Sequence, residues 1–170
     1  MANITVRPAT AADVGTILRF IKGLAAFEKE PDAVKTTTAD LLRDGFGAQP
    51  KFEALIAEIA QEPVGFALFF PTYSTWEGRA GMYLEDLFVE EQWRRHGVGE
   101  ALLRELAQVT VSRGCARLEL AVLHWNPARE FYHRLGMTHQ GQWFPYRIDG
   151  EALRALSEKK PERQSLAPKS

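Results

Sequence analysis

The sequence is poor in the residues that cross-link a chain or hold a metal. Among its 170 residues there is one cysteine, Cys115, and there are four histidines. A single cysteine excludes an intrachain disulfide, and no cysteine or histidine spacing is typical of a metal site. We therefore expect no bound metal, and we interpret Cys115 as a structural thiol rather than a nucleophile.

Long apolar runs and an excess of charge of one sign are also absent. No stretch reaches the roughly 18 apolar residues of a membrane-spanning helix, and the opening MANITVRPAT lacks the apolar core of a signal peptide. The net charge is -1 and there is no long basic block, so nucleic acid is a poor candidate partner. We expect a cytoplasmic protein that binds neither membranes nor nucleic acids.

Apolar periodicity predicts helices and strands in the order β-α-α-β-β-β-α-β-α-β. Residues 71–81 are predicted to form a loop, 98–112 a helix, and 141–149 the last strand. This order is typical of an α/β fold with a mixed sheet and a crossover helix between the strands near Leu84 and Leu120. The length and a hydrophobic content of 45% favour one domain, which we place at 1–158 and which a polar tail follows at 159–170.

A glycine stretch after the strand at 82–89 is the first candidate for a ligand site. The segment EEQWRRHGVGEALL runs from that strand into the predicted helix at 98–112. A helix start leaves backbone N–H groups unpaired and carries partial positive charge, and glycines let a ligand approach those groups. These features favour a diphosphate site. The alternative is an ordinary turn before an amphipathic helix, since neither a P-loop nor a third dinucleotide-binding glycine is present.

The stretch Arg94-x-x-Gly97-x-Gly99 resembles the acyl-CoA signature of the GNAT superfamily of N-acetyltransferases. The segments LLRDGFG, YLEDLFV, LAVLHWN and FYHRLGM are similar to those of the diamine acetyltransferases, and more similar still to those of their thialysine acetyltransferase relatives. The resemblance covers about residues 3–157. It implies a mixed, mostly antiparallel sheet of six to seven strands with helices on both faces and two splayed, parallel central strands, at 82–89 and 116–122.

The resemblance also implies acetyl-CoA as the acetyl donor and a homodimer as the assembly. It assigns the backbone of one strand segment to the pantetheine arm, the loop before the helix to the diphosphate, and one asparagine to a second donor contact. In this sequence those positions are Leu87, Phe88 and Val89, then Arg94, Arg95, His96, Gly97, Val98, Gly99 and Glu100, and then Asn126.

Two residues match the positions that move protons in that family. Tyr132 corresponds to the tyrosine beside the thioester sulfur, where a phenol with a pKa of about 10 can protonate a departing thiolate. Read from the residues alone, Tyr132 is more typical of a helix core. Glu85 corresponds to the residue on the amine side, acting directly or through water. A solvated strand face or a structural ion pair is the alternative for Glu85. Because neighbouring strand residues point to opposite faces, Glu85 and Asp86 are predicted not to share a pocket wall.

The amine itself is predicted to meet a loop with aromatic and acidic residues. By the resemblance these are Phe27 and Glu28, with Trp76 as a further aromatic wall. Gln140, Gly141 and Gln142 stand where polyamine-specific relatives carry acidic residues, which leaves thialysine, lysine-like amino acids or a shorter diamine as substrates. Three functions stay open: acetylation of a small primary amine by direct transfer in a ternary complex, acetylation of a protein lysine or N-terminus, and non-catalytic acyl-CoA sensing.

Overall fold

The computed structural model describes residues 3–159, so most of the predicted tail lies outside the described residues. The chain forms two compact units, one ending at Leu123 and the other beginning at His124. The single domain at 1–158 therefore stays a prediction.

The first unit holds five strands and three α-helices. Its elements are β1 (Ile4–Pro8), α1 (Val14–Phe27), α2 (Thr38–Phe46), β2 (Glu53–Ile59), β3 (Glu62–Ser74), β4 (Arg79–Val89), α3 (Val98–Ser112) and β5 (Leu118–Leu120), with short 3-10 turns at Ala11–Asp13 and Glu91–Trp93. The bounds predicted for α3 are correct. The predicted loop at 71–81 is wrong for most of its length, because β3 and β4 continue to pair as far as Ser74 and Arg79.

The strands follow one another in the sheet in the order β1-β2-β3-β4-β5. The first three pairs are antiparallel, and β4 pairs with β5 in parallel after the crossover through α3. A tight turn joins β2 to β3, where Ala60 and Gln61 both have positive φ angles, 51° and 68°. Such a turn matches the right-handed twist of a hairpin. The mixed sheet and the parallel pair near Leu84 and Leu120 were both predicted correctly.

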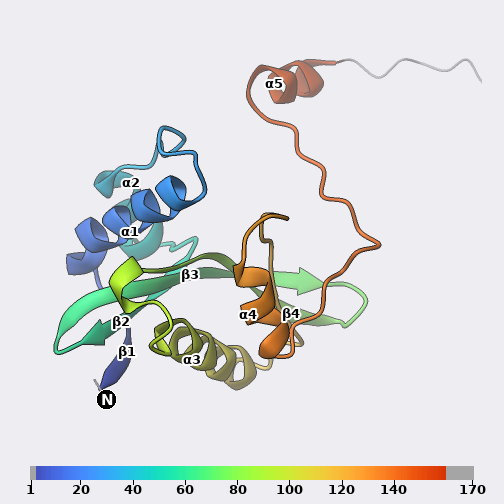
Figure 1. Ribbon diagram of the computed structural model, residues 1–170. Coiled ribbons are helices and arrows are strands. Elements are labelled where there is room, and N and C mark those ends of the chain that lie inside the picture. The colour runs from blue at the N-terminus through green and yellow to red at the C-terminus, as the bar shows by residue number, and fades with distance from the viewer. Residues whose placement is uncertain (1–2, 160–170) are drawn as a thin grey trace, which may run out of the picture. The chain divides into compact units, whose positions relative to one another are not determined.

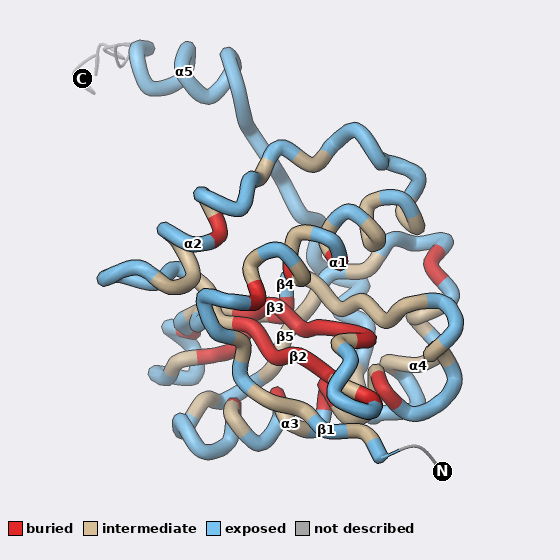
Figure 2. The backbone as a smooth tube through the Cα atoms, turned by 90° about the vertical axis from the view of Figure 1, so that its left-hand side faces the viewer, coloured by how far each residue is buried: buried red, intermediate tan, exposed pale blue. Residues whose placement is uncertain are grey.

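Helices cover both faces of this sheet (Figure 1). On one face α1 and α2 pack on a cluster of buried side chains, which is formed by Ile17, Phe20, Leu41, Ala54, Ile56, Phe66 and Leu68. On the other face lies α3, which contacts β1, β2, β3 and β4 and buries Val98, Leu102, Leu103 and Leu106. The inner strands are therefore buried on both sides, as the continuous buried stretch of β2 and β3 in Figure 2 shows.

The 3-10 turn before α1 is fixed to the sheet by an ion-pair network. Arg7 on β1 donates to both carboxylate oxygens of Asp13, at 2.9 Å each, and its Nε donates to Glu58 on β2 at 2.8 Å. Asp13 also accepts from the backbone N–H and the hydroxyl of Thr10, the capping pair predicted at the start of this segment. The hydrogen bonds from Arg7 hold the pKa of Asp13 at about 2.

The second unit contains α4 (Ala128–Arg134) and α5 (Gly150–Glu158) and, within its described part, no strand. The predicted strand at 141–149 is wrong. Its aromatic residues Trp143, Phe144 and Tyr146 suit a strand by composition, but they are 68%, 79% and 96% exposed. A strand exists only where a neighbour pairs with it, and no pairing occurs here in residues 3–159.

Two parts of the predicted sheet are therefore corrected. The sheet has five strands in the described part of the chain rather than six to seven, and β5 lies at its edge, so the parallel pair is not central. In residues 3–159 no helix is long and apolar enough to cross a membrane. The same residues contain no group of three His, Cys, Asp or Glu side chains arranged to hold a metal ion.

Candidate active site

Strand β4 contains a bulge at the predicted catalytic position. Phe69 on β3 lies opposite Leu84, whereas the preceding residue, Leu68, lies opposite Asp86, so Glu85 is an extra residue in β4. Neighbours on β3 point to opposite faces, and cross-strand partners share a face. The bulge therefore places Leu84 on the α3 face and Asp86 on the α1 face, although residues two apart in a regular strand share a face.

Beyond the bulge, β4 has a strand neighbour on one side only. Its parallel pairing with β5 runs from Met82 to Leu84 and ends there, because β5 ends at Leu120. Residues 86–89 still pair with β3. On the other side, the backbone groups of Leu87–Val89 face away from any strand of the first unit. The pairing with β5 thus leaves a backbone edge on β4 to which an amide-containing arm can hydrogen-bond, and the splay of the parallel pair stays a prediction.

A group of three carboxylates lies at the bulge, and we call it the acid cluster: Glu28, Glu85 and Asp86. Glu28 directly follows α1, and burial raises its pKa. Burial, together with the charges of Glu85 and Glu28, raises the pKa of Asp86 from 3.8 to about 6. The two charged groups that shift this pKa are both negative. A cationic ligand placed among these side chains would lower the cost of ionising Asp86.

The loop between β4 and α3 has the backbone shape expected of a diphosphate cradle. Arg95 and Gly97 have positive φ angles, 65° and 88°, and Gly97 is the N-cap residue of α3 without a side-chain cap. A glycine cap supplies no side-chain oxygen to the first-turn N–H groups, which suits an outside acceptor. Val98 is buried, and the Glu100 carboxylate pairs with Arg104 at 2.7 Å, so these two residues offer a ligand their backbone rather than their side chains.

Arg94 turns toward α1. Its Nε donates to the Val89 carbonyl at 2.9 Å. Its guanidinium carbon lies 4.8 Å from the ring centre of Phe27 and 5.6 Å from that of Phe88. The Arg94 carbonyl in turn lies 2.8 Å from Nδ1 of His96. The side chain therefore joins the end of α1 to the end of β4.

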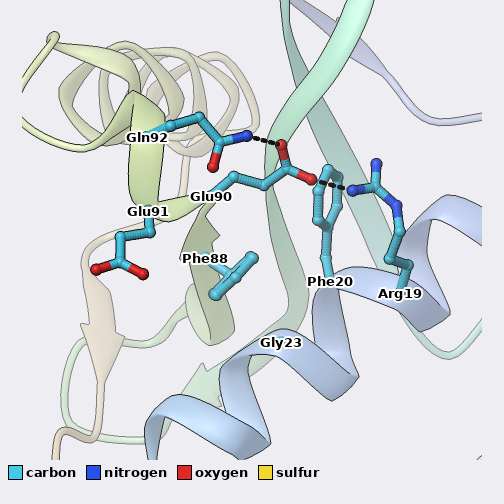
Figure 3. Close-up of a pocket in the computed structure, with 7 residues that line it drawn as sticks. All are labelled: Arg19, Phe20, Gly23, Phe88, Glu90, Glu91 and Gln92. Carbon is cyan, nitrogen blue, oxygen red and sulfur yellow. Dashed lines mark hydrogen bonds and ion pairs between the residues drawn. The ribbon is translucent and has the colours of Figure 1, made fainter.

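A shallow cleft opens between α1 and the end of β4 (Figure 3). It is lined by Arg19, Phe20, Gly23, Phe88, Glu90, Glu91 and Gln92. Glu90 accepts from Arg19 and from Gln92, so its charge is balanced inside the cleft. At Gly23 the absence of a Cβ matters, because a Cβ there would lie 2.6 Å from Cζ of Phe88. We therefore interpret the walls of this cleft as a close contact between α1 and β4 that fixes the ring of Phe88.

The second unit carries the remaining predicted residues. Asn126 is buried, and its Oδ1 accepts from the backbone N–H of Ala128, the first residue of α4. Tyr132 lies on α4, half-buried, with its ring 5.3 Å from that of Phe131. The carbonyl of Tyr132 accepts from Leu135 and Met137, which closes the helix. The roles of Asn126 and Tyr132 toward the donor stay predictions.

The structure thus brings together Phe27, Glu28, Phe88 and the start of the glycine loop, but not Trp76. Trp76 is 87% exposed in the turn between β3 and β4. Glu85 lies six residues along β4 from Arg79, which is about 20 Å at the usual rise of a strand. Only an extended ligand spans that distance, and the role of Trp76 stays a prediction.

Asp86, which was not among the predicted site residues, lies where the charges of Glu85 and Glu28 act on it. Glu85 was expected on the amine side and Asp86 on the opposite face. The structure leaves Glu85 exposed in the bulge and places Asp86 on the face of α1, where Glu28 also acts on it. The adjacent carboxylates in the sequence indicate this part of β4. No feature of the sequence indicates the bulge, which determines the face to which each carboxylate points.

Known proteins resemble the chain over nearly its whole length. Residues 20–137 match the model of the acetyltransferase (GNAT) family. The thialysine N-epsilon-acetyltransferase of Bos taurus is 40% identical over 171 residues, covering 94% of this chain and 100% of the relative. The spermidine/spermine N(1)-acetyltransferase-like protein 1 of Homo sapiens is 39% identical over 90% of this chain and 24% of its own length.

A solved structure shares the fold. An integron cassette protein from the mobile metagenome of V. cholerae superimposes with a TM-score of 0.77 at 23% identity, over 94% of this chain and 99% of that one. Together with the match to the family model, the likeness in sequence and fold leaves one assignment: this chain belongs to the GNAT family of acetyltransferases.

Proposed function

We propose that this chain transfers the acetyl group of acetyl-CoA to the primary amine of a small cationic molecule. The observation that carries this proposal is the acid cluster at the bulge, beside a strand edge that is open to an acyl carrier. A cationic amine gains favourable contacts with Glu28 and Asp86. An uncharged substrate would leave these carboxylates uncompensated.

The residues of the first unit fit the acetyl donor. The edge of Leu87–Val89 that faces away from β3 offers backbone groups to the amides of a pantetheine arm, although the Val89 carbonyl already accepts from Arg94. The loop from Arg94 to Glu100 offers the first-turn N–H groups of α3 to a diphosphate, with Arg95 as an exposed charge. Asn126 is proposed as a further contact, on the resemblance alone. No metal is needed for this chemistry, because the thioester is already activated.

The transfer requires two protons to leave the nitrogen and one proton to reach the sulfur. The amine is mostly protonated at neutral pH, since its pKa is near 10.4, so Glu85 is proposed to accept a proton from it, directly or through water. The neutral nitrogen then forms a bond to the acetyl carbon, and the carbon–sulfur bond breaks with its electrons leaving on sulfur. Tyr132 is proposed to give its phenolic proton to that thiolate, and the second proton that the nitrogen loses as it becomes an amide restores the phenol. No covalent enzyme intermediate is involved.

The substrate class follows from the charges at the site and from the relatives. Relatives with 40% and 33% identity are named thialysine N-epsilon-acetyltransferases. Because Gln140, Gly141 and Gln142 carry no charge, they offer no contact to a second, distant ammonium group. We therefore propose thialysine or a lysine-like amino acid as the preferred acceptor, followed by short diamines, then polyamines.

A panel of acceptors tests the proposal directly. Thialysine, lysine, putrescine, spermidine, spermine and a histone-like peptide would each be assayed with acetyl-CoA by release of free thiol. We expect a higher kcat/KM for at least one small amine than for the peptide. Faster acetylation of the peptide than of every amine would favour the protein-lysine alternative and overturn the proposal.

Replacing the proposed acid separates catalysis from donor binding. Tyr132→Phe is expected to lower kcat by about 100-fold or more, while calorimetry shows unchanged affinity for acetyl-CoA. Tyr146→Phe, at the exposed tyrosine of the same unit, is the matched control and should keep full activity. If the wild type and Tyr132→Phe both bind acetyl-CoA but neither turns over, the protein is instead a non-catalytic acyl-CoA sensor. The cytoplasmic location and the homodimer stay predictions.

A further inference from the structure

We infer that the side chain of Arg94 is a positioning residue that couples the amine site to the donor site. The sequence predicts that Arg94 contacts the diphosphate, whereas in the structure its side chain contacts Val89, Phe27 and Phe88. The inference rests on the proposed function, because it concerns how the two substrates of that reaction affect each other.

The two arginines of the loop point in different directions. Arg95 is exposed, and its own φ angle of 65° turns the chain there. Arg94 is half-buried, and its Nε is engaged by the Val89 carbonyl. A guanidinium held over the rings of Phe27 and Phe88 makes cation–π contacts that a lysine ammonium does not reproduce in shape. Arg95 is therefore the better placed of the two to contact a phosphate.

The partners of Arg94 are neighbours of the acid cluster. Phe27 directly precedes Glu28, and Phe88 lies two residues after Asp86 on the same face of β4. Val89, whose carbonyl holds Nε, ends the strand segment proposed for the pantetheine arm. One rigid side chain thus touches the end of α1, the end of β4 and the diphosphate loop. A donor whose pantetheine arm orders Leu87–Val89 would, through this side chain, also fix the position of Glu28 and Asp86.

This arrangement predicts that acetyl-CoA and the amine bind cooperatively. Coupling between two sites is reciprocal and commonly amounts to about 5- to 150-fold in affinity. A few cation–π contacts and one hydrogen bond place this protein at the lower end, at roughly 5- to 20-fold. The binding of either substrate should therefore strengthen the binding of the other by that factor.

The first test is Arg94→Lys, which keeps the charge but loses the planar stacking group and the Nε donor. We expect the KM of the amine to rise roughly 5- to 20-fold, with an unchanged thermal unfolding midpoint. Arg19→Lys is the matched control, because Arg19 also stacks on an α1 phenylalanine, 4.5 Å from the ring centre of Phe20, but lies outside the proposed contacts. Its amine KM should stay within about twofold.

A donor without a diphosphate distinguishes positioning from phosphate binding. S-acetylpantetheine carries the same thioester and pantetheine arm but no diphosphate. If Arg94 acts by positioning, Arg94→Lys raises the amine KM with this donor as it does with acetyl-CoA. For Arg95→Gln, by contrast, we expect a defect with acetyl-CoA that disappears with S-acetylpantetheine. A defect of Arg94→Lys that also disappears would show a phosphate ligand and overturn the inference.

Phe27→Leu keeps the test valid if Arg94→Lys is poorly folded. It removes one stacking ring and should raise the amine KM similarly, and the double variant should be no worse than the poorer single variant. Additive effects would overturn the coupling. If the wild type acetylates no amine, the proposed function and this inference both fail. If the wild type is active and neither variant changes the amine KM, only this inference fails.

Discussion

Asp13 and Asp86 are two inward-facing aspartates of the same unit whose pKa values move in opposite directions. Asp13 accepts hydrogen bonds from Arg7 and Thr10, and its pKa falls to about 2. Burial and the charges of Glu85 and Glu28 raise the pKa of Asp86 to about 6. Burial acts on both carboxyls, so the difference comes from the neighbours that the fold supplies to each.

The comparison separates a carboxyl whose partners the fold supplies from one whose charged neighbours are all negative. The partners of Asp13 come from β1 and the adjacent turn, so its interactions are complete in the free protein. Asp86 lies among like charges, an arrangement that costs stability unless a cation arrives. The fold thus stabilises itself through Asp13, whereas Asp86 is the carboxyl that we propose for the ligand.

The largest effect is expected from Asp86→Asn. Removing a charge that contacts a cationic amine should lower kcat/KM for the amine by about 100-fold, in line with a lost charge-assisted hydrogen bond. The same variant should unfold at equal or higher urea concentration than the wild type, because a poorly solvated charge is gone. Steady-state kinetics and urea titration measure the two quantities. Unchanged kinetics would place Asp86 outside the amine site.

Asp13→Asn should give the opposite pattern. We expect a loss of about 2 kcal/mol in the free energy of unfolding at pH 7, the equivalent of the depressed pKa, with kcat and KM nearly unchanged. Urea denaturation followed by circular dichroism measures the loss. The comparison fails if Asp13→Asn lowers activity without lowering stability.

The pH dependence of stability should differ in sign at the two positions. The folded state holds the proton of Asp86 more tightly than the unfolded state does, so the cost of its charge is present above pH 6 and is relieved between about pH 6 and 4. Relative to Asp86→Asn, the wild type should gain about 1 to 2 kcal/mol over that window, less than the full shift because Asp86 is only half-buried.

At low pH, the contribution of Asp13 to stability changes in the opposite direction to that of Asp86. Its contribution is complete above about pH 4 and is lost as the pH falls through 2. Relative to Asp13→Asn, the wild type should therefore lose stability in acid. Urea titrations of the three proteins from pH 2 to 8 would show both trends. Parallel curves for the wild type and Asp86→Asn would mean that the Asp86 pKa is ordinary.

The smallest effect is expected from Glu28→Gln. It removes one of the two negative charges that act on Asp86, so the pKa of Asp86 should fall toward its usual range. The amine KM should rise by a few-fold at pH 8, because one attraction for the cation is lost. A carboxyl titration followed by NMR would detect the pKa change. An unshifted Asp86 would separate Glu28 from the acid cluster.

Much of the fold could be predicted from local sequence, because it depends on local physics. Helix α3 has the predicted bounds, and Thr10 and Asp13 form the predicted capping pair. The strand predicted at 141–149 does not form, because a strand depends on a distant partner that aromatic composition does not guarantee. Helix α2 likewise begins at a local signal, the capping box of Thr37 and Asp40.

The candidate site was predictable in its parts and not in its arrangement. The family signature predicts the glycine loop as the donor site, and the adjacent Glu85 and Asp86 predict the amine side. Which carboxylate faces α1 depends on the register of β3 against β4. The inward turn of Arg94 depends on where Phe27 and Phe88 lie in space. The spacing of residues along the sequence predicts neither the register of β3 against β4 nor the positions of these two rings.

The bulge at Glu85 shifts by one residue the alternation of side chains between the two faces of β4. Upstream of it, Met82 and Leu84 face α3; downstream, Asp86 and Phe88 face α1. Deleting Glu85 would restore the regular alternation of β4. Every side chain of β4 after that position would then move to the opposite face of the sheet. The position of Asp86 beside Glu28 and the contact between Phe88 and Phe20 would then be lost together, although these four side chains would still be present in the chain.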